Sequence, residues 1–133
     1  MDRHALLVDA LFSQSNYVVA KKMFDATALR HEAIASNLAN LETPGYKRLD
    51  LAPSFSAELQ RAAAGGNGAQ VARLHPALAI DANSPALRPD GNTVQLEDEL
   101  LALNQNTLQH TLETQLVTGS LLKLRLAITG RAA

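Results

Sequence analysis

The C-terminal third of the sequence predicts a single helix that is too long for a compact domain of this size. Asn92 or Thr93 can begin it as an N-cap, the acidic run 97–99 suits its first turns, and Gly130 is a typical residue just past a helix end. A helix over about residues 93–129 would be roughly 55 Å long. A compact chain of 133 residues has a radius of gyration of only about 14 Å.

Apolar residues on this predicted helix form two seams on different faces. The first seam consists of Leu96, Leu100, Leu103, Thr107, Thr114, Val117, Leu121, Leu124 and Ile128. The second seam consists of Leu101, Leu108, Leu112, Leu116, Gly119, Leu122 and Leu126. One seam would satisfy a partner helix in the same chain, and the second needs another partner. A helix at the centre of an intramolecular bundle is the alternative, but the chain offers only one other long helix, so we favour packing against another molecule.

That other helix is predicted within residues 1–42, with a break near 13–16 and a longer segment starting at about Tyr17. Its apolar stripe consists of Ala20, Met23, Thr27, Ile34, Leu38 and Leu41, with Phe24 and His31 at the edge. Alanine and leucine dominate the hydrophobic residues and only 4% of residues are aromatic, which favours helix over strand. We therefore predict a mainly α fold in which the long N- and C-terminal helices pair as an antiparallel coiled-coil hairpin.

The middle of the chain, 43–91, contains all five prolines and most of the glycines. A short helix over 54–64 and short strands over 69–74 or 77–80 are compatible with it. We predict a small, loop-rich insert that is partly β or disordered. The predicted organisation is an N-terminal helical region 1–42, this insert, and a C-terminal helix region 92–133.

Several classes of function are excluded by what the sequence lacks. The formal net charge is −1 and basic residues are not clustered, so nucleic acid is not an expected partner. There is no cysteine, and the four histidines lack metal-ligand spacing. Nucleophile-elbow and phosphate-loop motifs are absent, so we expect no enzyme, no metal and no cofactor. No apolar run reaches the roughly 18 residues of a transmembrane segment, and the N-terminus does not resemble a cleaved secretion signal.

The stretch SNLANLETPGYKR, residues 36–48, ends the first long helix in an unusual way. Pro44 and Gly45 suit the two central positions of a type II turn, which would stop the helix. Asn37 and Asn40 lie on one side of its last turn. Their carboxamides are expected to donate to the last carbonyls or the outgoing loop and to accept from the turn. We predict a fixed elbow.

This stretch resembles the N-terminal signature of the flagellar axial proteins, the family of rod, hook and hook-filament junction proteins. The matching residues are Asn37, Leu38, Ala39, Asn40, Thr43, Pro44, Gly45 and Tyr46. The C-terminal segment resembles the matching helix of one short, proximal rod protein of that family. The residues that match there are Asp90, Gly91, Asn92, Val94, Glu97, Asn106, Thr107, Leu108, Leu116, Gly119, Leu122, Leu124, Arg125 and Gly130.

The resemblance implies a structural subunit of the flagellar basal-body rod, whose terminal helices pair and pack with neighbours into a helical tube. It implies export through the flagellar type III apparatus and assembly on the periplasmic side. The implied partners are other copies of the chain, other rod proteins, the rod-base adaptor FliE and the export gate. The residues expected to pack are Met23, Ile34, Leu41, Leu100, Leu103, Leu108, Leu112, Val117, Gly119, Leu121, Leu122, Leu124 and Ile128.

Three alternatives stay open at this point. The first is a sister rod protein of similar length, FlgC, although the entry at 90–92 and a tyrosine-free helix favour the proximal protein. The second is a soluble helical-hairpin adaptor or secretion chaperone that forms a closed oligomer. The third is a ligand-binding bundle or enzyme, which needs polar residues in the seams. The candidates for that role are Thr107, His110, Thr114 and Gln115.

Overall fold

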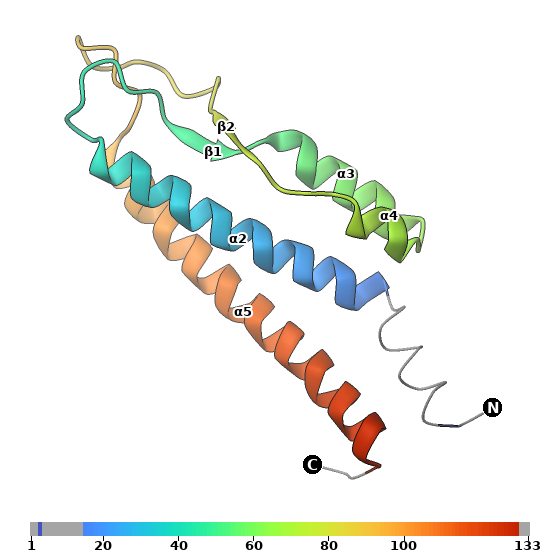
Figure 1. Cartoon of the computed structure of the whole chain (residues 1–133). Coiled ribbons are helices and arrows are strands. Elements are labelled where there is room, and N and C mark those ends of the chain that lie inside the picture. Colours follow the sequence, from blue (N-terminus) through green and yellow to red (C-terminus); the bar gives the residue numbers. More distant parts are fainter. Residues whose placement is uncertain (1–2, 4–14, 131–133) are drawn as a thin grey trace.

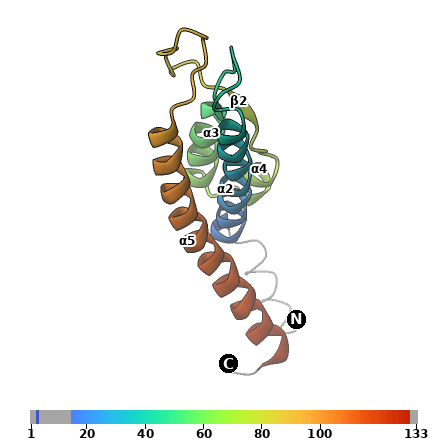
Figure 2. The same cartoon turned by 90° about the vertical axis from the view of Figure 1, so that its left-hand side faces the viewer.

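Two long antiparallel helices dominate the structure. The computed structural model of the chain describes residues 3 and 15–130. Helix α2 (Ser15–Ala39) leads into the middle segment, and helix α5 (Leu96–Thr129) returns beside it (Figure 1). A view at right angles shows α5 continuing past the N-terminal end of α2 (Figure 2). The predicted mainly α fold, with paired terminal helices and a small middle of loops and short strands, is confirmed. No helix in the described part of the chain has the length and hydropathy to cross a membrane.

The ends of the helices agree only partly with the sequence signals. Helix α5 ends at Thr129, followed by Gly130 in the left-handed conformation with φ 66°, as predicted. Its start is at Leu96, three residues later than expected, and the N-cap residue Gln95 makes no side-chain capping bond. The first half of the predicted break at 13–16, and nearly all of the region before it, lies outside the described residues. The second half is helical, because α2 begins at Ser15 and not at about Tyr17.

The middle segment is more ordered than the composition indicates. It contains β1 (Leu49–Leu51), α3 (Pro53–Ala64), α4 (Gly68–Ala72) and β2 (Leu78–Ile80). Strands β1 and β2 pair antiparallel. The predicted short helix and the strand at 77–80 are confirmed. The suggested strand over 69–74 is wrong: α4 forms there because the Asn67 side chain caps it by accepting from the Gln70 N–H at 3.2 Å.

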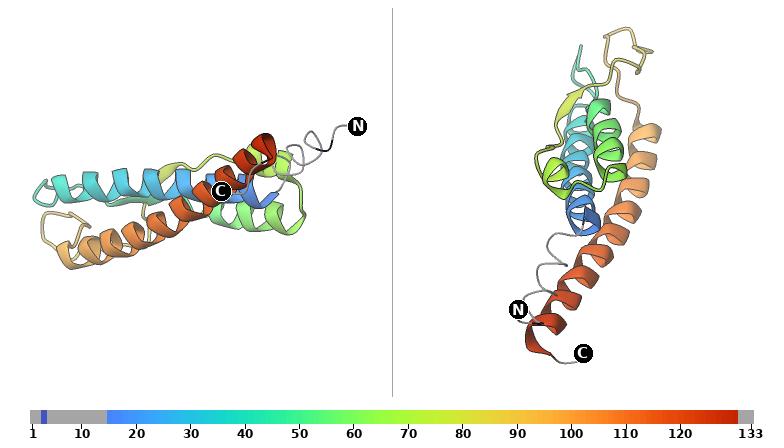
Figure 3. Two further views of the ribbon diagram at one scale, coloured as in Figure 1. Left: turned by 90° about the horizontal axis from the view of Figure 1, so that it is seen from below. Right: turned by 90° about the vertical axis from the view of Figure 1, so that its right-hand side faces the viewer.

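The hydrophobic core lies between α2 and this middle segment. Its buried residues are Ala26, Phe55, Leu59, Ala62 and Val71. Figure 3 shows α3 and α4 packed along one side of α2, with α5 on another side. The large side chains of this core, Phe55, Leu59 and Val71, therefore all come from the middle segment. The division of the chain at 42 and 92 stays a prediction.

The interface between α2 and α5 is polar, which differs from the predicted seams. The buried face of α5 carries Glu99, Asn106 and Glu113, spaced seven residues apart, with Ala102 between the first two. The leucines lie elsewhere. The large apolar residues of the predicted α5 seams that are exposed are Leu96, Leu100, Leu101, Leu108, Leu112, Leu116, Leu121, Leu122 and Ile128. Apolar periodicity failed here because it counts leucines and cannot detect polar groups that pair across the interface.

Most of the other residues that were expected to pack are partly buried. Leu103, Val117 and Gly119 of α5 are partly buried. In α2, Ile34 is buried, whereas Met23 is partly buried. Leu41, just beyond α2, is also partly buried. The Leu124 side chain falls outside the described part. The stripe predicted for α2 is therefore largely an internal packing face, and the two seams of α5 are largely not.

The position of the core predicts different effects for one substitution at two leucines. Leu59→Ala removes a buried side chain of α3 and should lower the free energy of unfolding by about 2–5 kcal/mol. Leu87→Ala, at a leucine that is 68% exposed, should change it by less than about 0.5 kcal/mol. Urea denaturation followed by circular dichroism measures both. Equal effects would place the core elsewhere.

Candidate functional site

The elbow after α2 contains the predicted type II turn. The Tyr46 N–H donates to the Thr43 carbonyl at 3.2 Å, and Gly45 has φ 73°, as the third residue of such a turn requires. The Gly45 N–H donates to the Asp90 carbonyl at 2.9 Å. This bond joins the elbow to the segment that leads into α5, so the two long helices are connected at one end through their adjoining turns.

Asn37 is the central side chain of the elbow, and it is fully buried. Its Oδ1 accepts from the Leu49 N–H at 2.9 Å and from the Tyr46 hydroxyl at 3.3 Å. Its Nδ2 donates to the Leu49 carbonyl at 2.9 Å and to Glu99 Oε2 at 3.2 Å. The carboxamide therefore pairs with β1 as a strand residue would, while it also holds α5. The predicted contact with the outgoing loop is confirmed.

Asn40 acts locally, at the end of α2. Its Nδ2 donates to the Ser36 carbonyl at 2.8 Å, and its Oδ1 accepts from the Thr43 hydroxyl at 3.1 Å. It thus satisfies a carbonyl of the last turn, as predicted, but it holds the first residue of the type II turn by accepting from that residue's hydroxyl and not from a backbone N–H. Of the other motif residues, Leu38 is partly buried, and Pro44 is exposed. Ala39 is exposed as well.

Asn92 has the role in the elbow that sequence reasoning missed. It was expected to cap α5, but its Nδ2 lies 2.9 Å from the Asn40 carbonyl, 3.2 Å from the Leu41 carbonyl and 2.8 Å from the Thr43 carbonyl. Its Oδ1 accepts from the Val94 N–H at 2.7 Å. A buried residue before one helix thus caps the C-terminus of the other. The only sequence signal was its place in the resemblance.

Glu99 lies in the first turn of α5, as predicted for the acidic run 97–99, but its carboxylate has partners that the sequence did not indicate. Its side chain is fully buried, and its Oε1 lies 2.5 Å from Arg48 Nε. Arg48 also pairs with Asp50 at 3.1 Å and Asp81 at 2.9 Å. Burial lowers the pKa of Arg48, but hydrogen bonds and charge from Glu99 and Asp50 outweigh it and raise this pKa above its ordinary value. The guanidinium is therefore a permanent cation that links Asp50 of β1, Asp81 just after β2 and Glu99 of α5.

The polar contacts continue along the interface of the two long helices. Asn106 Nδ2 donates to the Thr27 carbonyl at 2.9 Å, and the Thr27 hydroxyl donates to Glu113 Oε2 at 2.7 Å. Gln109 Nε2 donates to Glu113 Oε1 at 3.0 Å. His110 Nδ1 lies 2.8 Å from the Thr27 hydroxyl. Because buried polar groups need partners, these contacts fix the register of α5 against α2.

The polar seam residues proposed for a ligand site do not converge. His110 joins the helix interface through Thr27. Thr107, Thr114 and Gln115 are exposed, and the Thr114 hydroxyl donates to the His110 carbonyl in the preceding turn at 2.8 Å. Within the part of the chain that the structure describes, no three histidine, aspartate or glutamate side chains gather as a metal site. The elbow and the polar interface are thus arrangements that hold helices.

The turn geometry predicts opposite effects of one substitution at two glycines. Gly45→Ala places a side chain at φ 73° and should destabilise the fold by about 1–2 kcal/mol. Gly65→Ala, at φ −76° with only ordinary contacts for an added Cβ, should be neutral or stabilise by about 0.4–1 kcal/mol. Thermal unfolding of both variants tests this. A Gly45→Ala protein as stable as the parent would contradict the assigned turn.

Substitution by alanine should destabilise the fold more at Asn37 than at Asn40. Asn37→Ala leaves buried groups of β1 and α5 without partners and should cost about 3 kcal/mol or more, since each unsatisfied buried group costs about 1–3 kcal/mol. Asn40→Ala, on a partly exposed side chain, should cost about 1 kcal/mol. Chemical denaturation compares them. A larger loss of unfolding free energy for Asn40→Ala than for Asn37→Ala would show that Asn37 is not the central side chain of the elbow.

The elbow residues lie within a match to a known protein family. The family model described as Flagella basal body rod protein matches residues 25–47, which include the whole elbow motif. The chain is 34% identical to the flagellar basal body rod protein FlgB of Cereibacter sphaeroides over 111 residues, which cover 76% of this chain and 84% of the relative.

Two further relatives bear the same description. Identity to FlgB of Escherichia coli (strain K12) is 29%, over 71% of this chain and 78% of the relative. Identity to FlgB of Aeromonas hydrophila is 28%, over 95% of this chain and 98% of the relative. The match to the Aeromonas hydrophila protein covers nearly the whole chain and so reaches well beyond the elbow motif. The chain therefore belongs to the family of flagellar basal body rod proteins of the FlgB type.

Proposed function

We propose that this protein is a structural subunit of the proximal rod of the flagellar basal body, which packs through its terminal helices into a helical tube. The observation that carries the proposal is the orientation of α5. The residues that this helix buries against α2 are largely polar, whereas most of its leucines are exposed, the reverse of an ordinary soluble hairpin. Together with membership of a rod family, this points to a function in assembly.

The outward face of α5 is too apolar for a lone molecule. Its most exposed leucines are Leu101, Leu108, Leu112 and Leu116, whose exposed fractions are 57%, 65%, 53% and 58%. Contiguous apolar surface of this kind generally marks a contact with another molecule. A tube subunit has neighbours on more than one side, which accounts for apolar residues on more than one face of the helix.

The partners in this proposal are other copies of the chain, other rod proteins, the rod-base adaptor FliE and the flagellar export gate. The subunit is exported by the flagellar type III apparatus and assembles on the periplasmic side. Two properties support export as an extended chain: the sequence has no cysteine, and the core contains few large side chains. A small core is easily unfolded.

The elbow has a defined part in this assembly. The hydrogen bonds of Asn37, Asn40 and Asn92 fix the direction in which the chain leaves α2 and returns to α5. A fixed direction would hold the middle segment in one orientation on every subunit of a tube. The elbow would therefore position the subunit surface, and α5 would supply the contacts between subunits.

The proposal is tested by complementing a motile bacterium that lacks the gene. A Leu108→Gln, Leu112→Gln double variant should fold and be exported, because both side chains are exposed in the monomer, but it should fail to build rods. Ile80→Gln is the control, since Ile80 is 62% exposed and lies on β2, away from α5. Soft-agar motility, export assays and electron cryotomography of basal bodies provide the measurements.

The outcomes separate the parts of the proposal. Normal basal bodies with the double leucine variant would contradict packing through this face of α5. Normal basal bodies in the deletion strain itself would refute a function in the rod. A closed-oligomer adaptor predicts a discrete species in light scattering of the purified protein, whereas an open tube subunit predicts weak association that grows with concentration.

A further inference from the structure

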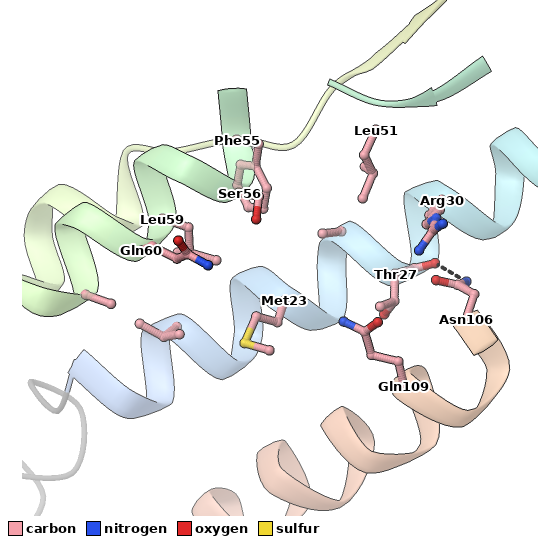
Figure 4. A pocket seen from close by; sticks show the side chains of 13 residues that line it. Met23, Thr27, Arg30, Leu51, Phe55, Ser56, Leu59, Gln60, Asn106 and Gln109 are labelled. Atoms are coloured by element: carbon pink, nitrogen blue, oxygen red, sulfur yellow. Dashed lines mark hydrogen bonds between the residues drawn. The ribbon is translucent and has the colours of Figure 1, made fainter. Parts of the chain in front are cut away.

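Two open cavities in the described part of the chain differ in charge. The first, of about 250 Å³, lies between α2, α3 and α5, and Figure 4 shows Met23 and Phe55 on its wall. The charged residue of its lining, Arg30, is paired with Asp50 at 3.2 Å. The second, of about 300 Å³, lies beside the elbow at the start of α5 and has exposed acids in its lining. The second cavity can therefore select a partner by charge.

This second cavity, called the elbow cavity below, combines apolar walls with carboxylates. Leu41, Leu87 and Leu96 line it, and the last two of these side chains are exposed. Glu42 and Glu97 line it as well, and both are exposed. A surface that offers leucines and carboxylates together suits an apolar side chain with basic neighbours.

Arg88 is the base in the lining of the elbow cavity, and it is already committed within the chain. Its guanidinium donates to the Leu41 carbonyl and lies 3.6 Å from the Glu42 carboxylate. Its Nε has no hydrogen-bond partner, but this atom has essentially no accessible surface, so a group in the cavity does not reach it. The charge that the cavity offers to another molecule is therefore that of its acids.

The far end of α5 has the complementary surface. Residues 114–130 include no acid, and Lys123 and Arg125 are exposed bases. At about 100° per residue, Leu122 and Leu126 lie between these two bases on the helix surface. Leu122 is exposed, and this end of α5 projects past the N-terminal end of α2 (Figure 2). It therefore offers leucines between bases, where the elbow cavity offers leucines beside acids.

Gly119 lies three residues before Leu122, on the same side of α5. A Cβ added at Gly119 would meet no atom within 4 Å, so packing inside the chain does not require a glycine there. Glycine within a helix is disfavoured relative to alanine, and its usual advantage is that another group can come close to the backbone. The approach of a second molecule accounts for a glycine at this position.

We propose that the elbow cavity of one copy binds the far end of α5 from a second copy. The surface of α5 that binds consists of Gly119, Leu122, Lys123, Arg125 and Leu126. Its leucines pack against those of the cavity, and its bases face the exposed acids. Because the two surfaces lie at opposite ends of α5, each contact leaves one of each free, and copies add head to tail in an open row. This contact deepens the rod function proposed above and rests on it, but it does not use the outward leucines at 108 and 112.

Charge reversal in the purified full chain tests the contact. Lys123→Glu, Arg125→Glu gives two acidic ends, and Glu42→Lys, Glu97→Lys gives two basic ends. Each variant alone should associate about tenfold or more weakly than the parent, because attractions become repulsions. An equal mixture should associate as the parent does, since each variant supplies the end that the other lacks. Sedimentation velocity measures association, which in the parent should weaken as salt is added, and circular dichroism checks the fold.

A control and a further variant keep the test decisive. Arg61→Glu, Arg73→Glu makes the same change of net charge at two exposed positions of the middle segment and should associate as the parent does. Gly119→Leu should fold even if a charge-reversed variant does not, because leucine favours helix over glycine and the space around this position is open. Its side chain should nevertheless block the contact and weaken association.

Several outcomes would overturn the proposal. One is a parent protein that stays monomeric at every concentration. Another is parental association by either charge-reversed variant or by a folded Gly119→Leu protein. A mixture of the two reversed variants that associates as weakly as each one alone would overturn it too. The rod function fails separately, through normal basal bodies in the deletion strain, and the Leu108→Gln, Leu112→Gln protein should keep this head-to-tail association.

Discussion

The rest of the structure depends on the contacts of the fully buried Glu99 side chain with Arg48 and Asn37. This side chain joins α5 to β1 through Arg48 and to α2 through Asn37. A buried carboxylate is tolerated only with such partners, and removing one partner of a buried ion pair commonly costs about 3–5 kcal/mol. Any shift of α5 along α2 would leave the carboxylate unpaired. The interaction therefore selects one register for the hairpin.

This constraint determines which face of α5 points outward. Once Glu99, Asn106 and Glu113 face α2, seven residues apart, helical geometry directs the leucines toward solvent. The hairpin gains its specificity from hydrogen bonds, and most of the leucines of α5 are left exposed. The small core around Phe55 and Val71 attaches the middle segment to α2 and stabilises the chain.

The features that the sequence predicted correctly depend on residues that are close together in the chain. A type II turn at Pro44 and Gly45, a helix stop at Gly130 and local bonding by Asn40 each depend on residues only a few positions apart. The features that the sequence did not predict depend on pairs of residues that are far apart in the chain. Glu99 differs from neighbouring acids only in facing Arg48, 51 residues away in sequence, and a count of apolar periodicity ignores such pairs.

The sequence by itself determined the long helices, the position of the elbow and the family, because propensity, turn chemistry and a contiguous motif act locally. The tertiary structure alone decided that the helix interface is polar and that Asn92 caps the helix before it instead of the helix after it. It also decided that the middle segment contains the core. Those outcomes depend on which distant groups satisfy one another once water is excluded, and no local pattern contains that information.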